Sequence, residues 1–293
     1  MTPESYVRSA AVMSTIATIE VVGHDSAETA VDTAFEWFRR IEACCSRFDT
    51  ASELSQLSSK IGTPVPVSAI LFEAVQFAIA VAEETGGAFD PTVGSRMEAA
   101  GFNREYRTGR PVQAAFDTDD SVSYRDVLPD PAQKTITLLK PMVLDLGSVA
   151  KGLAVDMAAR ELLPFKDFAI DAGGDLYLGG CNSEGRTWSV GIRHPQHDGE
   201  LIDSIRVSNQ AVCTSGDYER GEHILDPRRA RAAGNAVSVT VVAQTAMLAD
   251  ALATAAFVLG PAEGIQLLER IGVEGLIISP SLERFETPGM RHG

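Results

Sequence analysis

The stretch Asp167–Gly180, DFAIDAGGDLYLGG, decides the fold class of this chain. Two short runs that suit strands lie on either side of Gly173 and Gly174, and paired glycines are typical of a tight turn. Strands joined by so short a turn run antiparallel, because a parallel connection needs about a dozen residues or more. The stretch therefore predicts an antiparallel strand pair rather than a βαβ unit.

Strand and helix patterns follow one another irregularly on both sides of this pair. Because no regular βαβ period emerges, we expect an α+β fold with mixed, mostly antiparallel sheets packed against helices. The strands are expected at Met13–Gly23, Lys134–Leu139, Met142–Leu146, Trp188–Arg193, Ser204–Val207, Ala236–Val242 and Gly275–Ser279. The helices are expected at Asp25–Arg47, Ser68–Glu84, Val149–Leu163, Thr245–Leu259 and Pro261–Ile271.

The chain has 293 residues, a length that allows one large domain or two smaller ones. No internal repeat or low-complexity linker divides it, so we expect a single domain over residues 1–293. Residues 101–132 are polar, rich in aspartate and irregular, and they are the best candidate for an excursion that would separate two subdomains.

The formal net charge of −15 argues against nucleic acid and anionic membranes as partners, since such a surface would neutralise neither. A phosphate-bearing ligand would need a cation, a helix N-terminus or a few basic residues at its site.

No run of about 18 apolar residues exists, so no membrane span is expected. The first residues do not resemble a signal peptide, and the four cysteines have no CxxC spacing. We therefore expect a cytoplasmic protein with reduced thiols.

One pair of oxygen-bearing side chains has the spacing of a metal site. Asp250 and Thr254 are four residues apart in a predicted helix, so both lie on the same face. A carboxylate and a hydroxyl suit Mg²⁺, which takes few protein ligands and keeps water or phosphate in its shell. The spacing fits a solvated aspartate and a threonine bonded to its own helix as well, and taken alone it favours that structural role.

Asp145–Gly152, DLGSVAKG, has the pattern of a strand end, a glycine-containing turn and a helix start. Backbone N–H groups at a helix start can face an anion, and Lys151 adds positive charge in an acidic chain. The same residues fit an ordinary strand-to-helix turn in which Asp145 caps the helix, so both interpretations stay open.

Two further segments have the composition of a binding site. Gly86–Gly94, GGAFDPTVG, combines paired glycines with the flat apolar ring of Phe89, although a helix end followed by a turn explains the glycines as well. TSGDYER at 214–220 and HILDP at 223–227 place two polar clusters close together, which indicates a site loop rather than a core strand. His223 lies in this loop, with a surface histidine as the alternative.

Taken together, these segments resemble the ApbE-type FAD:protein FMN transferases in order and in detail. Eight stretches match in the family's order, which is far more than chance would produce. They are MST (13–15), SRFDTASELSQL (46–57), GGAFDPTVG (86–94), LDLGSVAKGLAVD (144–156), DAGGDLYLGG (171–180), TSGDYER (214–220), HILDP (223–227) and TAMLADALATAAFVLG (245–260).

The resemblance implies an ApbE-like, T-fold-like flavin transferase fold and a role for each matching residue. Asp250 and Thr254 fall on Mg²⁺ ligands, and Ser148 falls on a third ligand position that usually offers its main-chain oxygen. His223 falls on a histidine implicated in transfer. The positions that contact FAD are Met13, Phe48, Ala88, Phe89, Asp90, Asp145, Lys151 and Ile224.

The implied reaction is phosphoryl transfer from FAD, with Mg²⁺ as the cofactor. A Ser or Thr hydroxyl of an acceptor flavoprotein attacks the FMN-side phosphorus, and AMP leaves. The family's acceptors carry a short Ser/Thr-Gly-Ala-type motif that this chain lacks, which makes the acceptor a separate protein. Two alternatives stay open: an FAD pyrophosphatase that releases FMN and AMP, and a flavin-binding or delivery protein without turnover.

The chain departs from the family's pattern at two sites. Phe48 stands where a tyrosine is common, which keeps an aromatic ring and loses a hydroxyl contact. The segment after HILDP is basic, with Arg228, Arg229 and Arg231, and lacks the expected Thr-Gly. That segment is expected near the acceptor or the adenine, so the choice of acceptor stays open.

Overall fold

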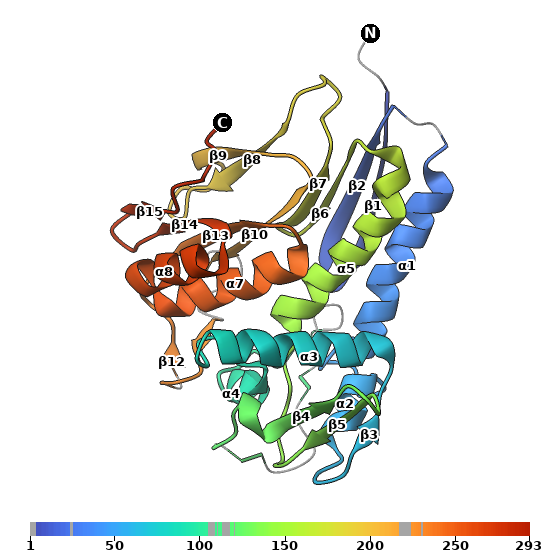
Figure 1. Cartoon of the computed structure of the whole chain (residues 1–293), viewed down its shortest axis with the longest axis vertical. Coiled ribbons are helices and arrows are strands. Elements are labelled where there is room, and N and C mark those ends of the chain that lie inside the picture. Colours follow the sequence, from blue (N-terminus) through green and yellow to red (C-terminus); the bar gives the residue numbers. More distant parts are fainter. Residues whose placement is uncertain are drawn as a thin grey trace.

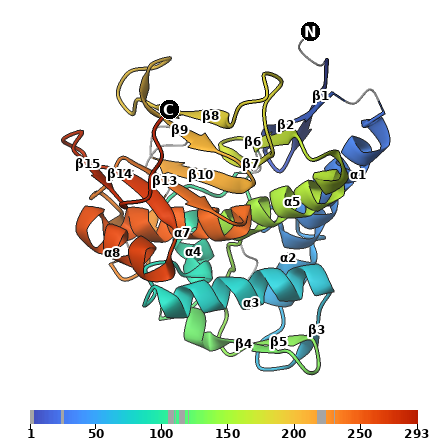
Figure 2. The same cartoon turned by 45° about the horizontal axis from the view of Figure 1, so that its top comes forward.

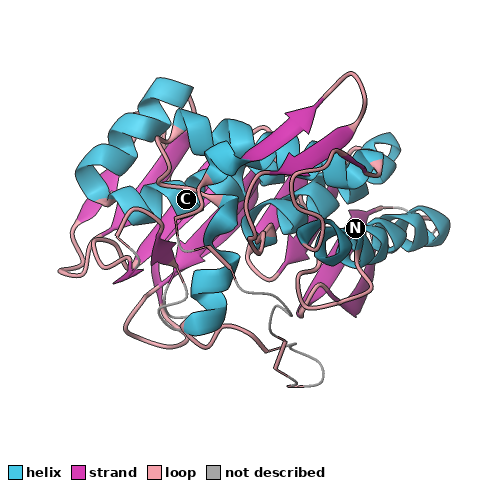
Figure 3. Cartoon of the chain, turned by 90° about the horizontal axis from the view of Figure 1, so that it is seen from below, coloured by secondary structure: helices cyan, strands magenta, loops and turns pink. Residues whose placement is uncertain are grey.

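The computed structural model describes residues 4–23, 26–104, 109, 111–112, 118–119, 121–216, 224–229 and 231–293, and Figure 3 distinguishes its helices, strands and loops. The elements follow the chain as Figure 1 labels them. The strands are β1 (Ser5–Val12), β2 (Thr15–Val22), β3 (Val65–Pro66), β4 (Val127–Asp130), β5 (Thr135–Leu138), β6 (Phe168–Ala172), β7 (Asp175–Gly179), β8 (Trp188–Arg193), β9 (Leu201–Val207), β10 (Gln210–Gly216), β11 (Leu225–Asp226), β12 (Arg231–Ala232), β13 (Ser238–Ala243), β14 (Glu274–Ile278) and β15 (Arg284–Glu286). The helices are α1 (Glu28–Cys45), α2 (Glu53–Ser58), α3 (Ala69–Glu84), α4 (Gly94–Ala99), α5 (Gly147–Leu162), α7 (Ala246–Leu259) and α8 (Pro261–Ile271), with 3₁₀ turns η1 (Pro91–Val93), η2 (Tyr124–Asp126) and η3 (Leu163–Phe165).

The main sheet has the strand order β1-β2-β6-β7-β10-β13-β14-β15, and every neighbouring pair in it is antiparallel. β6 and β7 form the strand pair expected at Asp167–Gly180, with Gly173 and Gly174 in the turn at positive φ. Glycine tolerates this region of φ, which explains why the chain reverses here. The predicted α+β fold with mostly antiparallel sheets is confirmed.

Helices cover one face of the main sheet and form the larger hydrophobic core with it (Figure 2). α1 packs along α5, α5 packs along α7, and α7 lies against β10 and β13. Phe38 of α1, Phe168 of β6 and Phe257 of α7 are fully buried in this core. None of the helices in the described ranges is long and apolar enough to cross a membrane.

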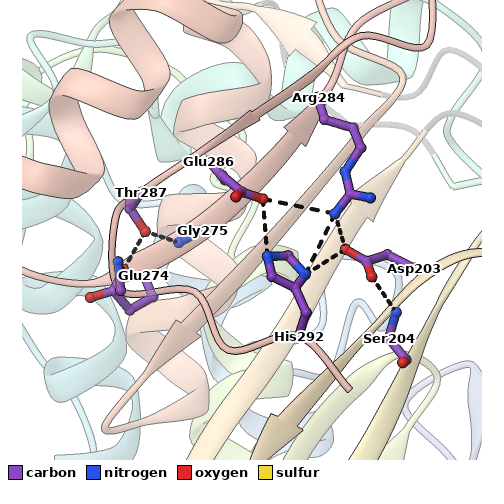
Figure 4. A network of polar contacts seen from close by, with 9 residues as sticks. Asp203, Ser204, Glu274, Gly275, Arg284, Glu286, Thr287 and His292 are labelled. Atoms are coloured by element: carbon purple, nitrogen blue, oxygen red, sulfur yellow. Dashed lines mark hydrogen bonds and ion pairs between the residues drawn. The ribbon is translucent and has the colours of Figure 1, made fainter.

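The hairpin of β8 and β9 covers part of the opposite face of the main sheet. Ile192 and Ile205 of the hairpin are buried against apolar residues of β7, β10, β13 and β14. The last residues of the chain hold this hairpin: Gly293 donates its N–H to the carbonyl of Ser204 at 2.8 Å. His292 contacts Asp203 of β9 at 2.8 Å, and Figure 4 shows both residues in one charged network with Arg284 and Glu286.

A small antiparallel sheet, in the order β3-β5-β4, lies on the far side of α3 from α5 and α7 (Figures 1 and 2). β4 lies at the end of the irregular region 101–132, and β5 follows directly after that region. Residues 105–108, 110, 113–117 and 120 of that region lie outside the described residues. The expected excursion, and with it the division into domains, stays a prediction.

One strand prediction was wrong, and two of the longer strands were not predicted. Met142–Leu146 is apolar but forms no strand: a Cβ placed at Gly94 would lie 2.5 Å from the carbonyl oxygen of Val143, so the segment runs directly beside α4. β1 was not predicted, because it is a sheet edge with mainly small and polar residues. β10 was not predicted either, and it contains the Thr214–Gly216 stretch that we expected in a loop.

Candidate active site

Asp145 joins three segments that are far apart in the sequence. Its Oδ2 accepts a hydrogen bond from Nε of Arg47 at 2.5 Å. Its Oδ1 accepts one from the backbone N–H of Gly147 at 2.7 Å, which closes an Asx turn where α5 begins. The backbone N–H of Asp145 donates to the carbonyl of Pro91 at 2.7 Å. The segments around residues 47, 91 and 145 therefore meet at Asp145, and Phe48 is the neighbour of Arg47 in the first of them.

Hydroxyl groups from three elements meet near the start of α5. Thr254 of α7 donates through Oγ1 to Oγ of Ser148 at 3.0 Å, and its hydroxyl lies 3.4 Å from that of Ser215 at the end of β10. Asp250 lies one turn before Thr254 on α7 and is 6% exposed. Ser148 has non-helical dihedral angles (φ −83°, ψ 15°), so the backbone of α5 is irregular at this point. Two of the three expected metal ligands are thus in contact, and the third is one helical turn away.

The start of α7 is held against α5 by Asp156. Its carboxylate accepts the backbone N–H groups of Ala246 at 2.7 Å and of Met247 at 3.0 Å, which satisfies two donors of the first turn. A Cβ at Gly152 would lie 2.5 Å from the Cα of Met247, so the two helices approach closely only with glycine at that position. Burial raises the pKa of Asp156 to about 6, against the opposing effect of the two N–H donors. The glycine and the aspartate together set the position of the helix that bears Asp250 and Thr254.

Lys151 of α5 forms an ion pair with Asp175 of β7, with 2.5 Å between Nζ and Oδ2. Burial alone lowers the pKa of Lys151, but the carboxylates of Asp175 and Asp250 outweigh it and raise that pKa above the usual value. The lysine side chain is 19% exposed and that of Asp175 only 1%. Lys151 is therefore charged at neutral pH and close enough to Asp250 to interact with its charge.

The oxygen atoms at this point suit a small hard cation. Mg²⁺ prefers oxygen ligands and is often bound through one or two carboxylates together with waters and phosphates. Asp250 offers one largely buried carboxylate and Thr254 offers a hydroxyl. Ser148 lies beside them at a helix start whose backbone is irregular. Within the described ranges, no three His, Cys, Asp or Glu side chains form a metal-binding group. A cation here would depend on the charge of Asp250 and on oxygens of its ligand, which fits Mg²⁺ and disfavours Zn²⁺.

Met13 lies in the turn between β1 and β2. Met13 and Ser14 both have positive φ (47° and 63°), a region that residues other than glycine rarely adopt. β2 pairs with β6, so this turn lies beside the Gly173–Gly174 turn, and a Cβ on Gly173 would collide with the side chain of Thr15. Met13 and Ser14 form the two-residue turn of a hairpin, where positive φ is favoured, so contact of Met13 with a ligand stays a prediction.

The segment after α3 is more buried than its sequence suggested. Ala88, Phe89 and Asp90 are 1%, 5% and 8% exposed, and the Phe89 ring belongs to the hydrophobic core. Asp90 accepts the N–H and the hydroxyl of Thr92 on Oδ1, at 2.9 and 2.7 Å, and the N–H of Tyr124 on Oδ2 at 3.1 Å. Burial raises the pKa of Asp90 despite these donors. The segment serves as the turn after α3, and its contact with FAD stays a prediction.

The histidine expected to act in transfer, His223, lies outside the described residues, together with residues 217–222. Its neighbour Ile224 is buried, and its carbonyl accepts the N–H of Ala233 at 2.9 Å. Arg96 of α4 donates through Nη1 to the carbonyl of Pro227 at 2.6 Å, which joins this segment to α4.

Three residues at the site had no role in the sequence-based interpretation: Arg47, Asp175 and Ser215. All three lie inside stretches that carry the family resemblance, so the motif itself was the available signal. Their partners are distant in the chain, 98 residues away for Arg47 and 39 for Ser215, and spacing within a motif cannot reveal such pairs.

Comparisons with known proteins identify the family of this chain. Residues 13–277 match the ApbE family. The chain is 32% identical to the FAD:protein FMN transferase of Haemophilus influenzae over 251 residues, which is 78% of this chain and 72% of the relative. It is 30% identical to the FAD:protein FMN transferase of Vibrio cholerae over 278 residues, which is 88% of this chain and 81% of the relative.

Solved structures give the same result. The ApbE protein of Thermotoga maritima superposes with a TM-score of 0.86 and 30% identity, covering 97% of both chains. The flavin transferase ApbE of Vibrio cholerae superposes with a TM-score of 0.84 and 26% identity, covering 97% of this chain and 96% of that one. With its sequence, its fold and the order of its motifs in agreement, this chain belongs to the ApbE family.

Proposed function

We propose that this protein is a Mg²⁺-dependent FAD:protein FMN transferase, which moves FMN from FAD to a Ser or Thr hydroxyl of an acceptor flavoprotein and releases AMP. The observation that carries the proposal is the contact of Thr254 with Ser148, one turn from the buried Asp250 and beside the charged Lys151. The names of the relatives in Haemophilus influenzae and Vibrio cholerae support the choice of FAD as the donor.

Asp250, Thr254 and Ser148 are the residues that would hold Mg²⁺. When bound, Mg²⁺ supplies charge neutralisation for the pyrophosphate and for the leaving oxygen. Lys151 adds a fixed positive charge beside the same phosphates. The chain has a net charge of −15, so binding of an anionic dinucleotide depends on the positive charges of Mg²⁺ and Lys151 at the site.

The transfer forms a bond between the acceptor's hydroxyl oxygen and the FMN-side phosphorus, and breaks the bond from that phosphorus to the AMP oxygen. The proton of the hydroxyl must leave during the attack, and the family resemblance assigns this role to His223. Phe48, Asp145 and Met13 are proposed to bind and orient the FMN half, and the turn after α3 and Ile224 are proposed to line the rest of the nucleotide.

Mass spectrometry of an acceptor protein incubated with the enzyme, FAD and Mg²⁺ tests this function. A gain equal to FMN minus water, absent with Asp250→Asn, is the expected result. AMP and FMN formed at the same rate without any acceptor would identify an FAD pyrophosphatase instead. Binding of FAD with no AMP under either condition would identify a flavin-binding or delivery protein.

A further inference from the structure

Arg47 is a buried cation that touches two residues expected at the flavin site. Its side chain is only 5% exposed. Nε donates to Oδ2 of Asp145 at 2.5 Å, and Nη2 donates to the carbonyl of Phe102 at 2.6 Å. The guanidinium lies over the ring of Phe48, 4.1 Å from its centroid. One side chain therefore contacts both Asp145 and Phe48.

The remaining nitrogen of Arg47 is unusual. Nη1 is buried and has no hydrogen-bond partner among the described residues. Native proteins satisfy nearly all buried donors, because a donor without a partner is unfavourable to folding. An arginine selected for stability alone would be expected to use this donor. Arg47 instead holds its guanidinium carbon over an aromatic ring, a cation–π contact that orients the ring.

Phe48 is suited to receive a flat ligand. It is partly exposed although Arg47 lies against its ring, so part of the ring surface remains accessible. Aromatic rings stack favourably on flat π-systems, and FAD has two of them, the isoalloxazine and the adenine. A ring held by a buried guanidinium loses little freedom when a ligand stacks on it, which favours binding.

Asp145 connects this aromatic platform to the oxygen site. It lies three residues before Ser148, in the turn that begins α5, and Arg47 fixes its carboxylate. A dinucleotide with its pyrophosphate near Ser148 and Lys151 would therefore have its rings within reach of Phe48.

We propose that Arg47 is a positioning residue of the flavin-nucleotide site, which orients Phe48 and Asp145 for FAD and acts through them. The inference rests on the proposed function, because it takes contact of Phe48 and Asp145 with FAD from that proposal. Arg47→Met keeps an apolar side chain of similar length and removes the guanidinium group. Arg47→Lys keeps a positive charge but lacks the planar set of N–H donors that the guanidinium offers.

The test is a titration of FAD by flavin fluorescence in Mg²⁺, combined with initial rates. Arg47→Met is expected to raise the Kd and KM for FAD about tenfold or more, the usual effect of losing a hydrogen bond to a charged group, with kcat at saturating FAD nearly unchanged. Arg47→Lys is expected to recover part of the loss. Arg270→Met is the control for the loss of an arginine with the same kinds of partner at an exposed site, because Arg270 also pairs with a carboxylate and a carbonyl, both of Glu84, in a contact between α8 and α3.

A double-mutant cycle separates positioning from a general structural role. If Arg47 acts through Asp145, the combined loss of FAD affinity in Arg47→Met/Asp145→Asn falls well short of the product of the two single losses. Unchanged FAD affinity in Arg47→Met, or losses that multiply fully, would overturn the inference. Failure of the wild-type protein to bind FAD at all would overturn the proposed function instead, so the two failures are distinct.

Discussion

The carboxylate of Asp156 on α5 accepts the backbone N–H of Ala246, the first residue of α7, at 2.7 Å. It is buried, and its pKa is raised to about 6 from the ordinary value of 3.8. A single carboxylate thus links the two helices that carry the proposed metal ligands. Its pKa of about 6 means that it gains or loses a proton in mildly acidic buffers.

The first prediction follows from the sign of that shift. Because the folded state holds the proton of Asp156 more tightly than the unfolded state, its contribution to the unfolding free energy is greatest below about pH 4 and is lost as pH rises to about 6. The loss is on the order of 3 kcal/mol. Urea unfolding at several pH values should therefore show wild type losing stability relative to Asp156→Asn over this range. If the difference in unfolding free energy between the two proteins does not change with pH, the raised pKa of Asp156 is contradicted.

The second prediction concerns the metal. Asp250→Ala should abolish AMP release at ordinary Mg²⁺, because Asp250 is the one charged side chain among the proposed ligands. Thr254→Ala should weaken activity and be partly rescued by more Mg²⁺. Mn²⁺ should replace Mg²⁺, whereas Ca²⁺ should support FAD binding with poor turnover, because its longer bonds misplace the phosphate. AMP release measured against metal concentration, with an acceptor present, checks the turnover expected of the two variants and of the two replacement metals. Full activity in excess EDTA would remove the metal from the mechanism.

The third prediction concerns the Gly173–Gly174 turn, which packs against Thr15. Gly173→Ala places a Cβ against Thr15 at a positive φ, whereas Gly185→Ala has a similar φ with nothing within 4 Å. Both changes carry a backbone cost of about 1–2 kcal/mol, and only Gly173→Ala adds the collision. Gly173→Ala should therefore be the less stable of the two by thermal unfolding and should also weaken FAD binding. Equal effects on FAD binding would show that the turn does not reach the ligand.

The fourth prediction concerns the pair of Lys151 and Asp175. Asp175→Asn removes the direct ion-pair partner of a largely buried lysine and leaves only the charge of Asp250 nearby, and breaking such a pair costs roughly 3–5 kcal/mol. Asp32→Asn breaks the ion pair of Asp32 with Arg8. The side chains of Arg8 and Asp32 are 37% and 53% exposed, so this change should cost far less stability than Asp175→Asn. Chemical unfolding of both variants measures the difference. Similar costs would mean that water reaches Lys151 more freely than its burial indicates.

The fifth prediction concerns His223, which the family resemblance places in transfer. His223→Ala should lower the transfer rate by about 10²–10⁴ with little change in FAD affinity, since a general base acts on the attacking hydroxyl rather than on binding. His197→Ala is the control, because His197 lies exposed in the turn between β8 and β9. If FAD affinity collapses while the rate at saturating FAD is normal, His223 is a binding contact.

The fold was predictable where local patterns determine it. The helical spacing around Phe35 and Phe38 identified α1, and the glycine pair at 173 and 174 identified the turn of β6 and β7. The apolar run at Met142–Leu146 was mistaken for a strand, because a buried loop and a short strand have the same composition. What separates them is the close approach of Gly94, nearly fifty residues earlier in the chain.

The site was predictable as a set of motifs and not as a set of contacts. Asp250 and Thr254 share a helix face, and sequence spacing alone implies that relationship. The contact of Thr254 with Ser148 spans 106 residues, and the ion pair of Lys151 with Asp175 joins a helix to a strand. Such pairs depend on tertiary packing, which a single sequence does not display.

The helix that bears Asp250 and Thr254 also determines how firmly the site is held. α7 lies directly after the inner strand β13, and the alanines at 249, 251, 253, 255 and 256 are completely buried. Amide protons in such an element exchange with solvent mainly through unfolding of the whole domain. Asp250 and Thr254 are therefore expected among the slowly exchanging residues, so binding of a cation by these two side chains would require little reorganisation of the α7 backbone.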